Sequence, residues 1–210
     1  MPKITALSSQ KNDSSRVSLY LDGKFTLGLS KDLACRVKLA VGQELSTQKI
    51  GEIKNQDQEE KHLDSVYHYL SYRPRSEKEV VDYLGKKGTE PGAIGRIVFR
   101  LKKEGYLDDQ EFARWWVDQR RRFRPRSRYF LKGELIKKGV GVEIINRVLE
   151  NVDESSLIEK IILERKNRLA DLEPSRAKEK LIAYLSRRGF SWENIKLGLE
   201  KTAPFLTKKT

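Results

Sequence analysis

The sequence is poor in the residues that build most catalytic and metal sites. It holds one cysteine and two histidines. Cys35 can form no disulfide within the chain and belongs to no cysteine cluster that could hold a metal. His62 and His68 stand apart from any third ligand, and zinc pairs on a helix are spaced about four residues apart. We expect ordinary helix residues at both histidines, a packed side chain at Cys35 and no metal site.

Long apolar stretches are missing as well. No run approaches the roughly 20 residues that span a bilayer, and the segment 1–21 lacks the apolar region of a signal peptide. Apolar residues make up 38% of the chain, against roughly 45–50% in an average globular domain. We expect a cytoplasmic protein without membrane association. The thin core favours an elongated, repetitive architecture.

Negative charge is also scarce. The chain has 43 lysines and arginines against 30 acidic residues, a formal net charge of +13. Such an excess is typical of proteins that bind nucleic acid or an acidic surface, although a basic surface that only aids solubility is the alternative. The segment "GKKGT" (Gly85–Thr89) has its glycines and lysines in the wrong order for a phosphate-binding loop. We expect a binding protein, not an enzyme, with no cofactor.

Residues 1–55 predict strands. Asp22-Gly23 interrupts the alternating apolar pattern of Ser15–Leu29, and this dipeptide between such runs is a strong hairpin signal. The segment "ITAL" (4–7) could supply a third strand. Ser30 is a suitable N-cap for a short helix after the hairpin. The sequence therefore predicts a small β-hairpin-containing extension at the start of the chain.

From about residue 57 the apolar period becomes helical and the sequence repeats. "RPRS" begins at Arg73 and again at Arg124, and ten residues after each proline comes "LGKKG" or "LIKKG". A looser third copy reads "EPSR", from Glu173, followed by "LSRRG". Proline interrupts a helix and biases the preceding residue towards an extended conformation. Each copy therefore predicts a helix, a proline break, a second helix, a glycine turn and a third helix.

The residues at the predicted helix ends support this repeat. Ser76 and Ser127 are N-caps by residue type, and Glu79 would complete a capping box with Ser76. Left-handed glycines would end the second helices at Gly88, Gly139 and Gly189. We expect a mainly α chain of three tandem three-helix repeats in an elongated curved body. The expected parts are the extension 1–55, the repeats 57–107, 108–156 and 157–203, and a basic tail at 204–210.

These motifs, with "GYLDDQEFA" (Gly105–Ala113) at the first junction and "RPRSRYFLKGELIKKGV" in the second repeat, resemble the RecX family, the bacterial modulators of the RecA recombinase. The resemblance covers roughly residues 60–200. It implies a non-catalytic regulator that binds the RecA filament and dampens its ATPase and strand exchange in recombination and DNA repair. It also implies direct binding of single- and double-stranded DNA. We expect these partners, and a monomer.

The strongest basic stretch is Gln119–Gly139, with six arginines and three lysines against Glu134 alone, a net charge of +8. Relative to the first repeat, Arg120 to Arg122 replace non-basic residues and Arg128 replaces a glutamate. Arginine binds phosphate through planar, bidentate contacts, which suits a salt-sensitive grip on the DNA backbone. A solvated basic face is the alternative, and some cations only complement helix dipoles. The candidate DNA-binding residues are Arg120, Arg121, Arg122, Arg124, Arg126, Arg128, Lys132, Lys137, Lys138, Lys86, Lys87, Arg73, Arg75, Arg187 and Arg188.

Other functions are less well supported. Asp108-Asp109 would suit a metal-dependent nuclease, but Asp108 more simply caps the helix that follows. Trp115 and Trp116 are adjacent and cannot both face the core of a helix bundle, so we expect one buried and one partly exposed ring, able to stack on bases. The alternative function is a general DNA-binding protein that holds the phosphate backbone without a recombinase partner.

Overall fold

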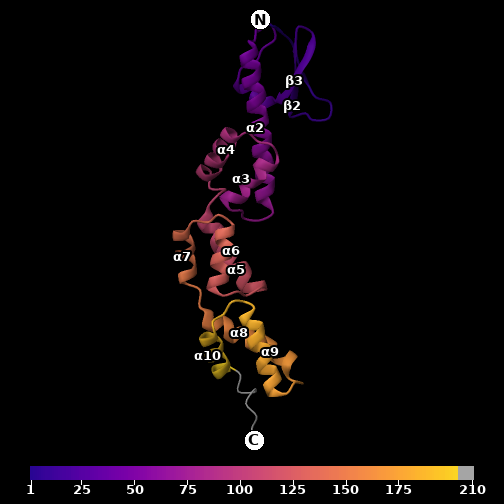
Figure 1. Cartoon of the computed structure of the whole chain (residues 1–210). Coiled ribbons are helices and arrows are strands. Elements are labelled where there is room, and N and C mark those ends of the chain that lie inside the picture. Colours follow the sequence, from indigo (N-terminus) through magenta and orange to yellow (C-terminus); the bar gives the residue numbers. More distant parts are fainter. Residues whose placement is uncertain (203–210) are drawn as a thin grey trace. The chain divides into compact units, whose positions relative to one another are not determined.

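The computed structural model describes residues 1–202, so the expected basic tail at 204–210 lies outside the described residues. Within that range the chain forms three strands followed by ten helices (Figure 1). Its contacts divide it into two compact units. The N-terminal unit holds residues 1–72 and 84–99, and the C-terminal unit holds residues 73–83 and the chain from residue 100 onward. In the described range, no helix is long and apolar enough to cross a bilayer.

The three strands form an antiparallel sheet in the order β1-β2-β3, and they confirm the predicted hairpin and third strand. Asp22 and Gly23 have φ angles of 47° and 78°. Positive φ at both central residues gives a turn whose twist matches that of the strands. The strands are β1 (Ile4–Ser9), β2 (Arg16–Leu21) and β3 (Lys24–Ser30).

A short helix, α1 (Lys31–Arg36), follows the sheet. Ser30 caps it as predicted, because its side chain accepts a hydrogen bond from the Leu33 backbone N–H at 3.0 Å. This helix buries only Leu33 and Ala34. The side chain of Cys35 is exposed, so the prediction that it packs was wrong. A helix this short has one buried face, and Cys35 lies outside it.

Helix α2 (Thr47–Ser71) begins ten residues before the predicted start and continues through the expected end of the extension. Its Asp57 is only 4% exposed. The Asp57 carboxylate accepts a hydrogen bond from the Ser30 N–H and forms an ion pair with Arg16, each at 3.0 Å. Figure 1 shows β2 and β3 beside this helix. The predicted helix start at residue 57 was wrong because α2 begins at a Ser46 cap, whose side chain accepts a hydrogen bond from the Lys49 N–H at 3.1 Å. Asp57 lies within the helix and holds it to the sheet.

The remaining helices confirm the three tandem three-helix repeats, with α2, α3 and α4 in the first, α5, α6 and α7 in the second and α8, α9 and α10 in the third. In the C-terminal unit the second and third groups each enclose a hydrophobic core of their own. The helices are α3 (Glu77–Lys86), α4 (Pro91–Lys103), α5 (Asp109–Phe123), α6 (Arg128–Lys137), α7 (Val142–Glu150), α8 (Glu154–Leu169), α9 (Pro174–Ser186) and α10 (Trp192–Thr202).

The C-terminal unit contains the same helix junction twice. The Ser76 hydroxyl accepts from the Glu79 N–H at 3.2 Å and donates to the Lys138 carbonyl at 2.7 Å. At the second junction the Ser127 hydroxyl caps α6, and the Ser127 backbone N–H donates to the Arg188 carbonyl at 3.0 Å. The start of α3 therefore meets the end of α6, and the start of α6 meets the end of α9. Opposite ends of helix dipoles attract each other in this arrangement.

A carboxylate also lies at the start of each of these helices. Asp109 accepts a hydrogen bond from the Glu77 N–H at 2.8 Å, and Glu154 accepts one from the Arg128 N–H at 2.5 Å. Both acids stand in the first turn of the next repeat's first helix, α5 or α8. Burial raises the pKa of Asp109, although the hydrogen bond from Glu77 acts in the opposite direction.

The glycines that end α6 and α9 have positive φ angles, 81° at Gly139 and 83° at Gly189, as predicted. They also lie where the helices approach closely. A Cβ added to Gly189 would stand 2.6 Å from the Ser127 Oγ and 2.9 Å from the Phe130 Cγ. Gly105, in the same unit, has a φ of 76° but no atom within 4 Å of such a Cβ.

We predict that Gly189→Ala destabilises the C-terminal unit more than Gly105→Ala does. Both changes force alanine into the left-handed region, at a cost of about 1–2 kcal/mol. Only Gly189→Ala also crowds a packed junction, which costs about 1–3 kcal/mol more. Urea unfolding of both variants measures the difference. Equal losses of unfolding free energy would show that the close approach at Gly189 contributes nothing.

Candidate nucleic-acid interface

The arginine run lies across the end of α5, the loop after it and the start of α6. Arg120, Arg121 and Arg122 fall in the last turn of α5. Successive side chains on a helix point about 100° apart, so these three cannot share one environment. The arginines of the run therefore lie in different environments, some within the fold and some at its surface.

Glu134 neutralises part of the run. The Arg120 Nε donates to a Glu134 oxygen at 2.7 Å, and the Trp116 Nε1 donates to the same oxygen at 2.8 Å. The Arg120 guanidinium also lies over the Trp116 ring, 4.6 Å from its centroid. The Arg126 Nε is 4.0 Å from the other Glu134 oxygen. Arg120 is thus held by internal contacts and Arg126 more loosely.

Trp115 and Trp116 are both partly buried, so the expectation of one buried and one partly exposed ring was wrong. Each ring packs against Phe112, with centroids 6.1 Å and 5.8 Å away. Each indole ring is also covered by a guanidinium group. Arg73 lies 5.4 Å from the Trp115 ring centroid, and Arg120 lies over Trp116. Both rings therefore belong to the edge of the core of the second repeat.

Arg128 is also committed within the fold. Its Nε donates to the Val152 carbonyl at 2.7 Å and its Nη2 donates to the Glu150 carbonyl at 3.2 Å. A guanidinium at the carbonyl end of α7 complements that helix dipole. The contacts of Arg128 with the end of α7 therefore explain, without a ligand, why arginine stands where the first repeat has a glutamate.

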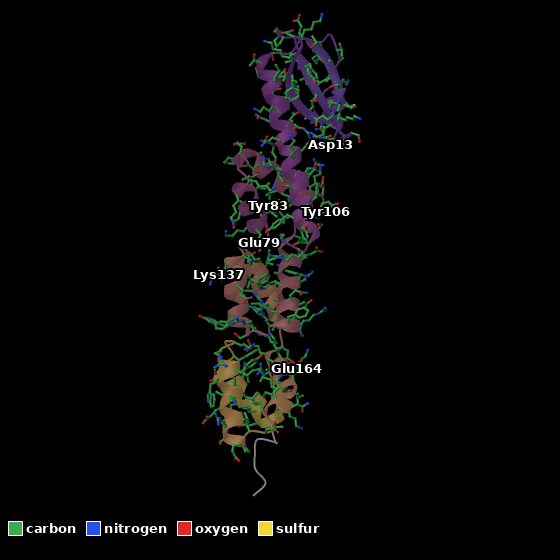
Figure 2. The ribbon with its side chains drawn as sticks, turned by 90° about the vertical axis from the view of Figure 1, so that its right-hand side faces the viewer. Asp13, Glu79, Tyr83, Tyr106, Lys137 and Glu164 are labelled. Atoms are coloured by element: carbon green, nitrogen blue, oxygen red, sulfur yellow. The ribbon has the colours of Figure 1, made fainter. Side chains whose placement is uncertain are left out.

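At the first junction, Glu79 joins two further candidate cations (Glu79 is labelled in Figure 2). Its carboxylate lies 3.0 Å from the Arg73 guanidinium and 2.6 Å from the Lys138 ammonium. Burial alone would raise the pKa of Glu79, but the hydrogen bonds from Arg73 and Lys138 hold it below its usual value. The Ser76 cap is confirmed, whereas the Glu79 side chain pairs with these cations and does not complete the predicted capping box.

The rest of the run is exposed. Arg121 approaches one carboxylate, Asp118, at 3.9 Å. Four other cations of this stretch have no carboxylate within 4.0 Å among residues 1–202, namely Arg122, Arg124, Lys132 and Lys137. Their charges therefore face solvent or a ligand.

Two hollows accompany these exposed cations. One, of about 330 Å³, is lined by Arg121, Arg122 and Lys160, together with the carboxylates of Asp118 and Asp153. The other, of about 490 Å³, follows α6 and is lined by three cations, the rings of Tyr129 and Phe130, Gly133, Ile136 and one carboxylate, Glu134, which Arg120 and Arg126 pair with; the cations are Arg126, Lys132 and Lys137. In Figure 2 the Lys137 side chain stands at the outer edge of its group of helices. A groove of cations and aromatic rings suits single-stranded nucleic acid.

Tyr129 and Lys160 did not emerge as candidates from the sequence. Tyr129 is 77% exposed and lies three residues before Lys132 on α6, a helical spacing from which it could have been identified. Lys160 belongs to α8 and reaches the first hollow only through the packing of the third repeat on the second. No local pattern in the sequence predicts that approach.

The remaining candidates are distributed over the chain. Lys86 and Lys87 lie in the N-terminal unit, at the end of α3. Arg75 and Lys87 each have an interaction partner. Arg187 is exposed, and the partly buried Arg188 lies over the Tyr184 ring.

The acidic pair at the first junction has a structural role. Asp108 accepts hydrogen bonds from the N–H groups of Gln110 and Glu111 at 2.7 Å and 3.3 Å, which confirms it as the N-cap of α5. Asp109 accepts from the Glu77 N–H. Among residues 1–202, no three His, Cys, Asp or Glu side chains gather in a group that could hold a metal ion.

Comparisons with known proteins agree with this fold. Residues 2–46 match the model of the regulatory protein RecX N-terminal domain, residues 63–108 the first three-helix domain of RecX and residues 108–149 the second. A regulatory protein RecX of Bacillus licheniformis is 36% identical over 208 residues, which cover 96% of this chain and 78% of that protein. One of Listeria monocytogenes is 32% identical over 197 residues, covering 91% and 72%.

Solved structures show the same arrangement. A crystal structure of a regulatory protein RecX superimposes with a TM-score of 0.74 at 25% identity, over 95% of this chain and 100% of that one. The RecX structure from Lactobacillus salivarius gives a TM-score of 0.60 at 22% identity, over 70% and 97%. The second likeness concerns the fold alone.

We predict that Glu79→Gln lowers the free energy of unfolding at neutral pH by about 1–3 kcal/mol, because two partly buried cations lose a charged acceptor. The pKa of Glu79 is lowered in the folded protein, so its contribution is complete above its unfolded value of 4.5 and is lost as the pH falls through the folded value. Urea unfolding at several pH values should show the two proteins converging in acid.

A matched control is Glu77→Gln, which removes a half-exposed carboxylate paired with the exposed Lys102. A pair with this much solvent access contributes at most about 1 kcal/mol. A loss at Glu79 no larger than at Glu77, or one that does not change with pH, would contradict the role given to Glu79.

Proposed function

The chain belongs to the RecX family of regulatory proteins, and from this premise we propose that it regulates the RecA recombinase in the cytoplasm. It binds the RecA filament on single-stranded DNA and dampens its ATPase and strand exchange during recombination and DNA repair. The protein acts by binding, as a monomer, and carries no catalytic step of its own.

The observation that carries this proposal is the set of exposed cations that have no ion pair, or only a long one, within the fold. Arg122 and Arg124 stand at the end of α5 with Arg121, whose only carboxylate is Asp118 at 3.9 Å, and Lys132 and Lys137 stand on α6. Charges of this kind release counterions from DNA when they approach its phosphates, which gives affinity without sequence preference. We place the main DNA contact here, in the second repeat.

The aromatic groove on α6 supports a preference for single strands. Tyr129 is 77% exposed beside Lys132 and Lys137, in a hollow of about 490 Å³. Unpaired bases can stack on such a ring while the lysines bind the backbone. In a duplex the faces of the bases are already stacked, so this contact is open only to single strands.

The paired cations contribute less to the proposed contact. To bind a phosphate fully, Arg120 would have to give up its ion pair with Glu134. Arg73 and Lys138 would each have to give up their ion pair with Glu79. Arg128 would have to give up two carbonyl oxygens at the end of α7. Each exchange loses a charge-assisted hydrogen bond of about 1.5–3 kcal/mol. We therefore assign these four a structural role and the exposed cations the DNA contact.

We predict that Arg121→Gln with Arg122→Gln weakens binding of single-stranded DNA and reduces its dependence on salt. Two lost phosphate contacts should change the slope of log affinity against log salt by about 1.4. Fluorescence anisotropy of a labelled oligonucleotide across a salt series measures this slope. Lys31→Gln with Lys54→Gln, which removes the same charge from the N-terminal unit, should leave the slope almost unchanged. The assignment fails if the two doubles behave alike.

A recombinase assay tests the wider proposal. We predict that the protein inhibits the RecA ATPase on single-stranded DNA at amounts well below the RecA concentration, and that the Arg121 and Arg122 double variant inhibits less. If inhibition appears only when the protein is sufficient to cover the free DNA, and extra DNA removes it, the chain is a general DNA-binding protein without a recombinase partner. That result would contradict the regulatory proposal while preserving the DNA contact.

A further inference from the structure

Tyr184 in the third repeat lies between two guanidinium groups. The Arg165 Cζ is 3.3 Å from the Tyr184 ring centroid, and the Arg188 Cζ is 3.5 Å from it. Both distances correspond to direct stacking, so the two groups must cover opposite faces of the ring. Arg165 comes from α8, and Arg188 follows Tyr184 by one helical turn at the end of α9.

Two more cations join this cluster. Lys180 and Arg187 are exposed and line, with Arg165 and Tyr184, a hollow of about 300 Å³. Leucine and alanine side chains complete its lining, and no acidic residue takes part in it. On α9, Lys180, Tyr184 and Arg187 recur at spacings of four and three residues and therefore share one face.

The positive charge of this cluster is not compensated within the fold. The ion pairs of the third repeat join other residues, Lys160 with Glu164, Lys196 with Glu200 and Lys201 with Glu159. Over the range 1–202, no carboxylate lies within 4.0 Å of Arg165, Lys180, Arg187 or Arg188. Burial lowers the pKa of Arg188, and repulsion from neighbouring arginines adds to that effect.

The first junction shows what is missing here. Lys138 and Arg188 occupy the same place in their repeats, immediately before Gly139 and Gly189. Lys138 pairs with Glu79, but the position equivalent to Glu79 in the second repeat, 51 residues on, is Phe130. The second junction thus keeps the cation of the first and has lost its carboxylate.

We propose that Arg165, Lys180 and Arg187 form a phosphate-binding site beside Tyr184, with Arg188 stacked on the same ring. Stacking on the ring fixes the two guanidinium planes, so little freedom is lost when they bind an anion. The hollow beside them admits a phosphate group, and Lys180 and Arg187 supply further charge at its rim. Where the phosphate is that of DNA, the inference rests on the proposed function and extends the DNA contact to the third repeat.

The competing explanation is that the two stacks only hold α8 to α9. Cation–π contacts contribute to stability without any ligand. The two explanations differ in one measurable respect, because a phosphate site makes the protein more stable when phosphate is present, whereas purely structural stacks do not.

The test is thermal unfolding of the full chain with pyrophosphate or an oligo-deoxythymidine, at constant ionic strength. We predict that the wild type is stabilised by several degrees near saturation, and that Arg165→Gln with Lys180→Gln weakens ligand binding roughly tenfold or more through the loss of two charge-assisted contacts. Lys178→Gln with Lys196→Gln, an equal charge change elsewhere in the third repeat, should behave as the wild type. Lys180→Gln with Arg187→Gln repeats the test without disturbing the stacked ring.

Stabilisation by both ligands supports a site for phosphate from any source, and stabilisation by the oligonucleotide alone supports one for the DNA backbone. If neither ligand stabilises the wild type, or if both double variants, which together change Arg165, Lys180 and Arg187, leave the effect intact, the site does not exist. No recombinase is present, so a failure here leaves the ATPase prediction untouched. If pyrophosphate stabilises the Arg121 and Arg122 double variant as much as the wild type, this site is separate from the main DNA contact.

Discussion

The C-terminal unit depends on the junction at which a buried serine begins one helix and contacts the end of another. Ser76 and Ser127 are 0% and 1% exposed. A buried polar group must be hydrogen-bonded, or it costs free energy comparable to a lost hydrogen bond. Each serine satisfies this requirement with the first turn of its own helix and a carbonyl at the end of the next repeat's second helix. The same contact thereby recurs within the C-terminal unit.

The same junction carries different charges in its two copies, and the proposed phosphate site rests on that difference. In the first, Glu79 pairs with both Arg73 and Lys138 and holds them in a structural contact. In the second, Phe130 occupies the place of that glutamate and Arg188 remains without a carboxylate. Glu134, the single acid of the arginine run, is occupied by Arg120 and Arg126. A shortage of carboxylates thus decides which cations remain without an ion-pair partner.

Features that depend on local backbone conformation were predictable from the sequence. The Asp22-Gly23 turn, the serine caps and the left-handed glycines all follow from what each residue's own φ angle and side chain permit. The start of α2 has a serine cap of the same kind at Ser46, but the first half of the helix is mostly polar, so no apolar period marks it as helical. The burial of Asp57 against a distant strand was not predictable from local sequence. The contacts of Asp57 with Ser30 and Arg16 can form only once the sheet has formed.

The sequence by itself determined the repeat, the family and the position of the excess charge, because these are properties of spacing and composition. Only the tertiary structure decided which candidate cations are held within the fold, since several of them meet partners far away in the chain. Lys138 meets Glu79 across 59 residues, and Arg128 meets the end of α7 more than twenty residues on. Arg165 and Tyr184 likewise meet only when α8 packs against α9. A charge count cannot show these partners because an ion pair depends on distance in space.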